Sequence, residues 1–159
     1  MNDEVTQVNV GQTKLIFGKH ALKEICSELR KLGVKKPLIV TDRQLRQIGM
    51  PDALLSLLEE GKFPYAVYDG IKTDPSGSEV DRGVVFLKGN SCDGVIGIGG
   101  GSVMDSAKCI TAMATNGGVL MDYDHANRNC RKFALASMPL INIPTTSGMG
   151  SLRRAVREV

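Results

Sequence analysis

The chain has 159 residues, 42% of them hydrophobic and 23% charged, which suits a single soluble globular domain. A formal net charge of +3 is too small to predict a nucleic-acid or membrane partner, and no apolar run approaches the roughly 20 residues that span a bilayer. There is no secretory pattern at the amino terminus, and four scattered cysteines form no CxxC pair. We therefore expect a cytoplasmic protein with reduced thiols.

Short β-rich runs alternate with helical patterns along the chain. In chain order the patterns predict a strand at residues 14–18, a helix at 21–32, a strand at 37–41, a helix at 51–60 and a strand at 66–68. A loop of turn-forming residues at 69–77, a helix at 80–88, a strand at 93–98, a helix at 102–115 and a strand at 140–143 follow.

This alternation predicts the fold class. Repeated β–α units with short connections are typical of a Rossmann-like α/β fold, an open and mostly parallel sheet with right-handed crossovers and helices on both faces. Ligands of such folds gather at the carboxyl ends of the strands. We therefore look for function in the segments that follow the predicted strands.

The strongest functional signal is GIGGGSVMDSAK, residues 97–108, where a predicted buried strand leads through glycines into a helix. Because Gly99, Gly100 and Gly101 carry no Cβ, backbone N–H groups can approach an anion, and the start of a helix adds partial positive charge. Ser102 and Asp105 also fit a capping box. The alternatives are a tight turn without a ligand for the glycines and simple capping for Ser102 and Asp105.

Two acidic residues and one hydroxyl-rich loop are further candidates. Asp42 follows a buried strand, where a carboxylate can accept both ribose hydroxyls of an adenosine and favour NAD over NADP, or can cap a helix. Asp74 precedes Pro75 and alone indicates a turn. Thr145 and Thr146, in IPTTSGMGS, could bond a cofactor's sugar or amide. His20 and His125 lie far apart and cannot build a three-ligand catalytic metal site.

GGGSVMDSAK followed by IPTTSGMG closely resembles the two signatures of the iron-containing (group III) alcohol dehydrogenase family, in order and at the family's spacing. The resemblance extends over residues 14–150 and implies the amino-terminal α/β domain, at residues 1–150, of a two-domain NAD-dependent enzyme. It implies a small alcohol or aldehyde substrate, homo-oligomers of the full-length form, and an iron or zinc ion held by an Asp and three His of a helical domain. We expect that helical domain to be absent here.

Carried over by position, Gly99, Gly100, Gly101 and Ser102 resemble the family's pyrophosphate loop, and Asp42 resembles the residue that binds the adenosine ribose. Asp74 stands where the family often has Asn. Thr145 and Thr146 resemble cofactor-contacting hydroxyl residues, and Asp105 and Lys108 match family positions on the helix after the loop. Met149 stands at a cofactor-contacting position where the family has threonine.

The last nine residues, SLRRAVREV, depart from the family, which has Glu after the serine. We expect residues 151–159 to be a foreign basic tail and the chain to bind NAD without oxidising an alcohol by itself. Three alternatives stay open. They are a relative of the glycerol dehydrogenases, maleylacetate reductases or dehydroquinate synthases, a non-catalytic nucleotide-binding remnant, and a kinase-like domain that binds ATP.

Overall fold

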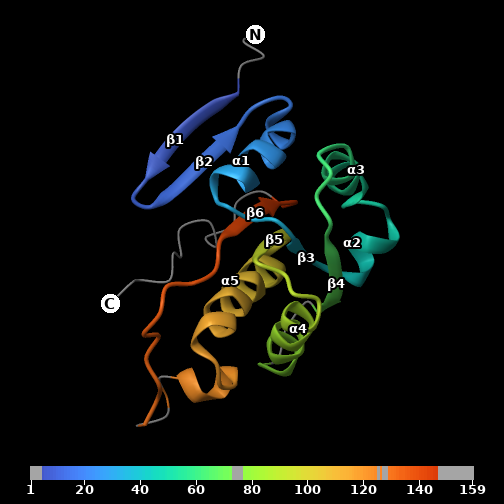
Figure 1. The fold of residues 1–159 in the computed structure, drawn as a ribbon. Helices are drawn as coiled ribbons and strands as arrows, with labels where there is room; N and C mark the ends of the chain where they lie inside the picture. Colours follow the sequence, from blue (N-terminus) through green and yellow to red (C-terminus); the bar gives the residue numbers. More distant parts are fainter. Residues whose placement is uncertain (1–4, 73–76, 125, 127–128, 147–159) are drawn as a thin grey trace.

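The fold is built on a four-stranded parallel sheet with the strand order β4-β3-β5-β6 (Figure 1). The computed structural model describes residues 5–72, 77–124, 126 and 129–146. The strands are β3 (Pro37–Asp42), β4 (Ala66–Ile71), β5 (Gly94–Gly99) and β6 (Leu140–Pro144). The predicted α/β class and mostly parallel sheet are confirmed.

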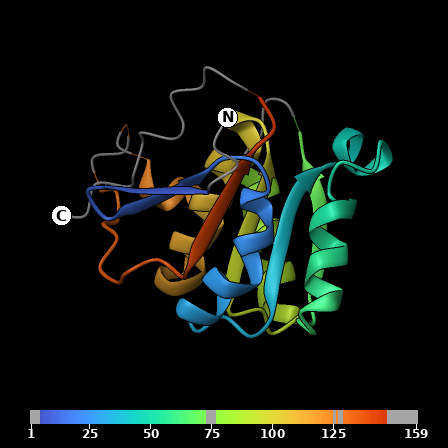
Figure 2. The same ribbon diagram turned by 90° about the horizontal axis from the view of Figure 1, so that it is seen from above.

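Helices cover both faces of this sheet (Figure 2). On one face lie α4 (Gly77–Gly89) and α5 (Gly101–Asn116), and on the other lie α1 (Ile25–Lys31) and α3 (Asp52–Glu60). Successive side chains of β3 alternate between the two cores, because Leu38 and Val40 pack with α4 and α5 whereas Ile39 packs with α1 and α3. In the described part of the chain no helix is long and apolar enough to cross a membrane.

The predicted strand at residues 14–18 does not join the parallel sheet. It forms β2 (Thr13–Phe17), which pairs antiparallel with the unpredicted strand β1 (Thr6–Val10) in a separate hairpin. Gly11 closes the turn with φ +61°, a conformation that favours glycine. All five residues of β1 are exposed, so this strand lacks the apolar run by which the buried strands were predicted.

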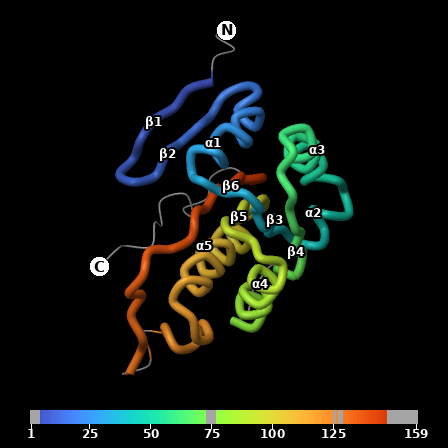
Figure 3. Tube along the Cα trace, viewed as in Figure 1, coloured from blue at the N-terminus to red at the C-terminus, as the bar shows by residue number. Residues whose placement is uncertain are grey.

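The remaining differences from the predicted elements are local. The helix expected at 21–32 is divided into the 3₁₀ turn η1 (Ala21–Glu24) and α1. The loop expected at 69–77 is partly wrong, because β4 continues to Ile71 and α4 begins at Gly77. Two short elements escaped prediction, namely α2 (Arg43–Gln47) and the 3₁₀ turn η2 (Leu120–Tyr123). The chain trace in Figure 3 follows these connections.

Helix α5 approaches β5 closely because Gly97 has no side chain. A Cβ on Gly97 would lie 3.0 Å from Cβ of Ala107 and would also meet Oδ1 of Asn142 on β6. Ala107 is fully buried, so its side chain cannot move into solvent to make room. This contact sets the distance between the sheet and the helix that follows the glycine loop.

We predict that Gly97→Ala lowers the free energy of unfolding by about 1–3 kcal/mol, because the added methyl group overfills the β5–α5 contact. Gly89→Ala is the matched control, since a Cβ there has nothing within 4 Å. This control should leave stability unchanged or raise it by up to about 1 kcal/mol. Urea unfolding of the three proteins measures the differences, and a Gly97→Ala protein as stable as the parent would contradict the packing described here.

The hairpin is tied to α1 by a cluster of charged side chains. The Glu28 carboxylate accepts hydrogen bonds from Nζ of Lys14 on β2 at 2.8 Å and from Nζ of Lys31 at 2.7 Å. The hydrogen bonds from these two ammonium groups hold the pKa of Glu28 below its ordinary value. Ionised Glu28 therefore stabilises the fold at neutral pH, and this contribution is lost as pH falls through the lowered pKa.

Replacing Glu28 should accordingly destabilise the protein in a pH-dependent way. We expect Glu28→Gln to lower the midpoint of thermal unfolding at pH 7, and this difference to shrink as pH falls from about 5 to about 3. Glu60→Gln serves as the control because Glu60 is exposed and forms no ion pair among the described residues. A Glu28→Gln deficit that stays constant across this pH range would show that ionisation of Glu28 is not its cause.

Candidate functional site

The loop between β5 and α5 forms the centre of the candidate site. Gly99 ends β5, Gly100 is the N-cap residue of α5, and the helix begins at Gly101. The first intrahelical hydrogen bond here runs from the Met104 N–H to the Gly100 carbonyl, at 3.0 Å. The amides of the first turn therefore lie outside the intrahelical ladder and point out of the helix end, as at any helix start.

The predicted capping box of Ser102 and Asp105 is wrong. Because the helix starts at Gly101, Ser102 lies inside its first turn and cannot serve as the N-cap residue. No side chain of the N-cap residue caps the helix, since that residue is a glycine. The Asp105 carboxylate instead accepts a hydrogen bond from Nζ of Lys108 at 3.2 Å.

Gly99 and Gly100 differ in what a side chain at each position would do. A Cβ on Gly99 would lie 2.7 Å from Cβ of Val103, so any side chain would push the first turn of α5 away from the sheet. Around Gly100 there is space, because the nearest atom to a Cβ would be Oγ1 of Thr146 at 3.9 Å. Packing does not require a glycine at position 100, but its absence of a side chain leaves the backbone open to the pocket beside it.

That pocket has a volume of about 490 Å³ and lies at the carboxyl ends of the parallel strands. It is bounded by α2 and the end of β3 on one side, by the end of β4 on another, and by the start of α5. Its lining consists of Asp42, Arg43, Gln44, Gln47, Ile71, Lys72, Gly100, Gly101, Ser102, Val103 and Thr146.

Asp42 has both of the roles that the sequence left open. It ends β3 and caps α2, because its Oδ1 accepts a hydrogen bond of 2.8 Å from the N–H of Leu45. It also lines the pocket, and its Oδ2 makes no hydrogen bond to any described residue. The cap orients the carboxylate, and one oxygen stays available to a hydroxyl group in the pocket.

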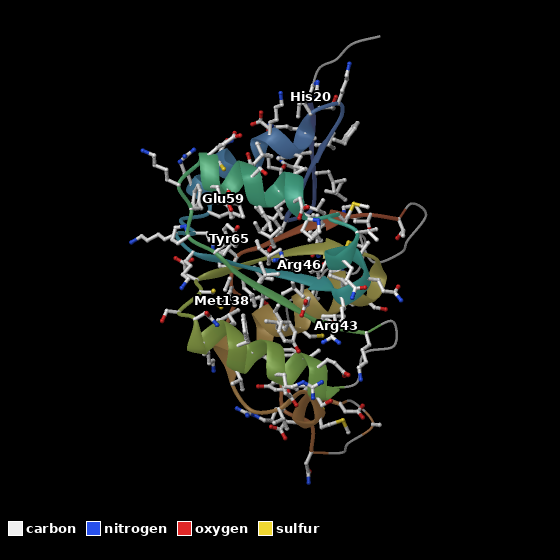
Figure 4. The ribbon with its side chains drawn as sticks, turned by 90° about the vertical axis from the view of Figure 1, so that its right-hand side faces the viewer. His20, Arg43, Arg46, Glu59, Tyr65 and Met138 are labelled. Carbon is white, nitrogen blue, oxygen red and sulfur yellow. The ribbon has the colours of Figure 1, made fainter. Side chains whose placement is uncertain are left out.

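Cationic side chains balance this carboxylate. Arg43 and Lys72 line the pocket from α2 and from the end of β4, and Figure 4 labels Arg43 together with Arg46 on α2. Nζ of Lys72 lies 3.5 Å from the carboxylate of Glu79, whose side chain is only 4% exposed. Arg82 approaches the same carboxylate, also at 3.5 Å. The pocket wall therefore offers positive charge together with one carboxylate, which suits a ligand that carries both phosphate and hydroxyl groups.

The hydroxyl-rich loop after β6 reaches the same pocket in part. The Thr145 N–H donates a hydrogen bond of 3.1 Å to the Gly99 carbonyl and so extends the β5–β6 ladder by one residue. Thr146 lines the pocket opposite Gly100, whereas Thr145 does not. Asp74 and Met149 lie outside the described residues.

The structure does not bring every predicted residue to this pocket. Asp105 and Lys108 lie further along α5, and Lys108 lines a different cavity, next to β6. Their contact with a cofactor stays a prediction. Sequence reasoning missed Arg43, Gln44, Gln47 and Lys72. For Arg43 and Gln44 the signal was their position shortly after the predicted strand at 37–41, whereas Lys72 and Gln47 lie further from the predicted strand ends and had no such signal.

The described residues do not fit the iron or zinc site implied by the family resemblance. Among them no three His, Cys, Asp or Glu side chains come together, and His20 lies before η1 on the side of the hairpin (Figure 4). His125 is outside the described residues. Burial raises the pKa of the Cys26, Cys92 and Cys109 thiols, so these side chains stay protonated and are poor nucleophiles at neutral pH. The described pocket therefore offers groups that can bind a ligand.

Known proteins are similar to this chain in sequence and in structure. Alcohol dehydrogenase 4 of Schizosaccharomyces pombe is 38% identical over 136 residues, which cover 86% of this chain and 31% of that protein. The NAD-dependent methanol dehydrogenase of Bacillus methanolicus is 35% identical over 86% of this chain and 35% of its own length. NADH-dependent butanol dehydrogenase A of Thermotoga maritima has a similar structure, with a TM-score of 0.79 at 27% identity over 90% of this chain and 35% of that one.

The chain thus spans about a third of the length of the relatives it matches. A 1,3-propanediol oxidoreductase structure gives the same picture, with a TM-score of 0.75 at 32% identity over 85% of this chain and 34% of that one. The family profile for iron-containing alcohol dehydrogenases matches residues 12–155, nearly the whole sequence. On these grounds the chain belongs to the iron-containing alcohol dehydrogenase family.

Proposed function

We propose that this chain binds NAD(H) as the cofactor-binding part of an NAD-dependent alcohol dehydrogenase. The observation that carries the proposal is the pocket in which the glycine-lined start of α5 faces Asp42 at the end of β3. The cofactors of two relatives support the proposal. One relative is an NAD-dependent methanol dehydrogenase, and another is an NADH-dependent butanol dehydrogenase. A related sulfoacetaldehyde reductase has been solved in complex with NAD⁺.

In this proposal the start of α5 binds the diphosphate. The backbone at Gly100 is open to the pocket, and the helix dipole places partial positive charge at the first turn. Arg43 adds positive charge on the opposite wall, and so does Lys72, whose ammonium is shared with the Glu79 carboxylate at 3.5 Å. A dinucleotide diphosphate can therefore be held by backbone amides on one side and by ammonium and guanidinium groups on the other.

Asp42 binds the adenosine ribose. Because Oδ1 already accepts a hydrogen bond from the Leu45 N–H, Oδ2 is the atom that accepts a hydrogen bond from a ribose hydroxyl. A 2′-phosphate at the same place would meet the carboxylate, so NADP is disfavoured unless Arg43 or Lys72 compensates. We therefore propose NAD as the preferred cofactor.

The complete reaction requires more than the described residues provide. NAD held by the start of α5 and by Asp42 would supply the hydride acceptor for alcohol oxidation, and this chain's own residues would bind and orient it. In the family this chemistry is assisted by a metal ion for which the described residues offer no ligands. We propose that this chain positions the cofactor and that a small alcohol or aldehyde is the substrate.

Blocking the backbone at Gly100 tests the diphosphate site. We expect Gly100→Val to weaken NADH binding at least about tenfold while the fold is retained, because the new side chain points into open space rather than into the core. Gly89→Val is the matched control, since it makes the same change where a Cβ has nothing within 4 Å. Nicotinamide fluorescence titration gives both affinities. Equal NADH binding by the two variants, or selective binding of ATP by the parent chain, would contradict the proposal.

Substitutions of Asp42 separate its two roles. Asp42→Asn keeps an oxygen that can cap α2 but removes the charge, so it should lower the preference for NADH over NADPH by about 10- to 100-fold without unfolding the protein. Asp42→Ala removes both the capping oxygen and the charge, so it should also lower the free energy of unfolding by about 0.5–2 kcal/mol. Calorimetric titration with both cofactors measures the ratio. An unchanged ratio in Asp42→Asn would exclude Asp42 as the ribose-binding residue.

A further inference from the structure

Glu79, in the first turn of α4, is a buried charged residue next to the candidate pocket, although it does not line it. In the part of the chain that the structure describes, no other charged residue is buried. Its side chain is 4% exposed, so the carboxylate has lost most of its hydration. A buried carboxylate destabilises a fold unless cations or hydrogen-bond donors lie beside it.

Two cationic side chains flank this carboxylate. Nζ of Lys72, directly after β4, and Nη2 of Arg82, one turn further along α4, each lie 3.5 Å from Oε1 of Glu79. Lys72 also lines the pocket, whereas Arg82 does not. The Lys72 side chain therefore belongs both to the pocket wall and to an ion pair with a buried carboxylate.

The place of Glu79 relative to β4 is fixed by its neighbours. Oη of Tyr68, on β4, donates a hydrogen bond of 2.8 Å to the Glu79 carbonyl, and the Tyr68 ring lies 5.7 Å from the ring of Phe86 on α4. Ile71, the last residue of β4, is buried just before Lys72. Helix α4 packs against β4 (Figure 1). The first turn of α4 therefore stays beside the end of the strand, and Lys72 keeps an anion within reach.

This ion pair changes what Lys72 can do for a phosphate group. A phosphate oxygen bonded to Nζ at about 2.8 Å would lie within about 6 Å of the Glu79 carboxylate oxygen. Like charges at that distance repel, and solvent screens a buried charge poorly. If Lys72 instead turned away toward the phosphate, Glu79 would lose one of its two cations. In both cases the attraction between Lys72 and a phosphate is reduced.

We propose that Glu79 is a positioning residue that holds Lys72 away from the 2′-phosphate of NADP and so strengthens the preference for NAD. This inference rests on the proposed function, in which Asp42 binds the adenosine ribose. Lys72 follows β4, the strand beside β3, and it lines the same pocket as Asp42. A 2′-phosphate next to Asp42 would therefore meet Lys72 together with Arg43. In this account two carboxylates disfavour NADP, Asp42 inside the pocket and Glu79 behind Lys72.

A double-mutant cycle on Glu79 and Lys72 tests the coupling. NADH and NADPH share the diphosphate, so the ratio of their dissociation constants isolates the effect of the 2′-phosphate. We expect Glu79→Gln to shift this ratio toward NADPH at least about fivefold, because the released Lys72 can bond the 2′-phosphate. In the double variant with Lys72→Met the shift should vanish. A purely structural role of Glu79 would not make the shift depend on Lys72. Calorimetric titration measures both affinities.

Glu28→Gln is the matched control for this cycle. It also removes one carboxylate that is paired with two cations, and Glu28 does not line this pocket, so the ratio should not change. Lys72→Met alone gives a second measurement that does not need the Glu79→Gln protein to fold. Because Glu79 already holds Lys72, we expect this variant to change the ratio less than about threefold.

The outcomes separate this inference from the proposed function. An unchanged ratio in a folded Glu79→Gln protein, or an equal shift in the double variant, would overturn the inference while NADH binding by the parent chain stands. A shift away from NADPH of more than about threefold in Lys72→Met would also overturn it, because Lys72 would then reach the 2′-phosphate in the presence of Glu79. A folded parent chain that binds neither cofactor would refute the proposed function itself, and this inference with it.

Discussion

The close contact between β5 and α5 is the constraint on which the candidate site depends. Gly97 lets Ala107 approach the strand, and Gly99 lets Val103 fold back over its end. Together these contacts bring the first turn of α5 against the edge of the sheet, where it faces the carboxyl ends of the neighbouring strands. Larger residues at either position would tilt the helix and open the pocket, so the same glycines that pack the core also place the helix start.

The opposite wall of the pocket depends on Asp42, which has two roles. Asp42 closes β3 and starts α2, and this short helix brings Arg43, Gln44 and Gln47 to the pocket. A helix of five residues is too short to be stable by itself, so its cap and its contacts with the sheet must hold it. One oxygen of the Asp42 carboxylate therefore caps α2, and the other is able to bind a ligand. A substitution of Asp42 alters both stability and ligand binding unless the new side chain keeps the cap.

The fold class and the glycine loop could be predicted because both leave local marks in the sequence. Residues 37–41 and 93–98 are buried apolar runs, and the glycines separate a strand from a helix. The hairpin was not predicted, since β1 is exposed and has no apolar run. The capping box failed because α5 starts at Gly101 with Gly100 as its N-cap residue, which places Ser102 inside the first turn. Lys72 was missed because β4 runs to Ile71, beyond the strand predicted at 66–68, and only the tertiary fold brings it to the pocket.

Nucleotide binding at the start of α5 is the central claim, and a backbone-amide NMR titration of the chain with NADH tests it most directly. We expect saturable shifts of the Gly101, Ser102 and Val103 amides and of the amides that follow Asp42, with little change along β6. Shifts confined to the cavity between β2 and β6, or no shifts in a folded chain, would contradict it. In that case the glycine loop would be a packing device alone.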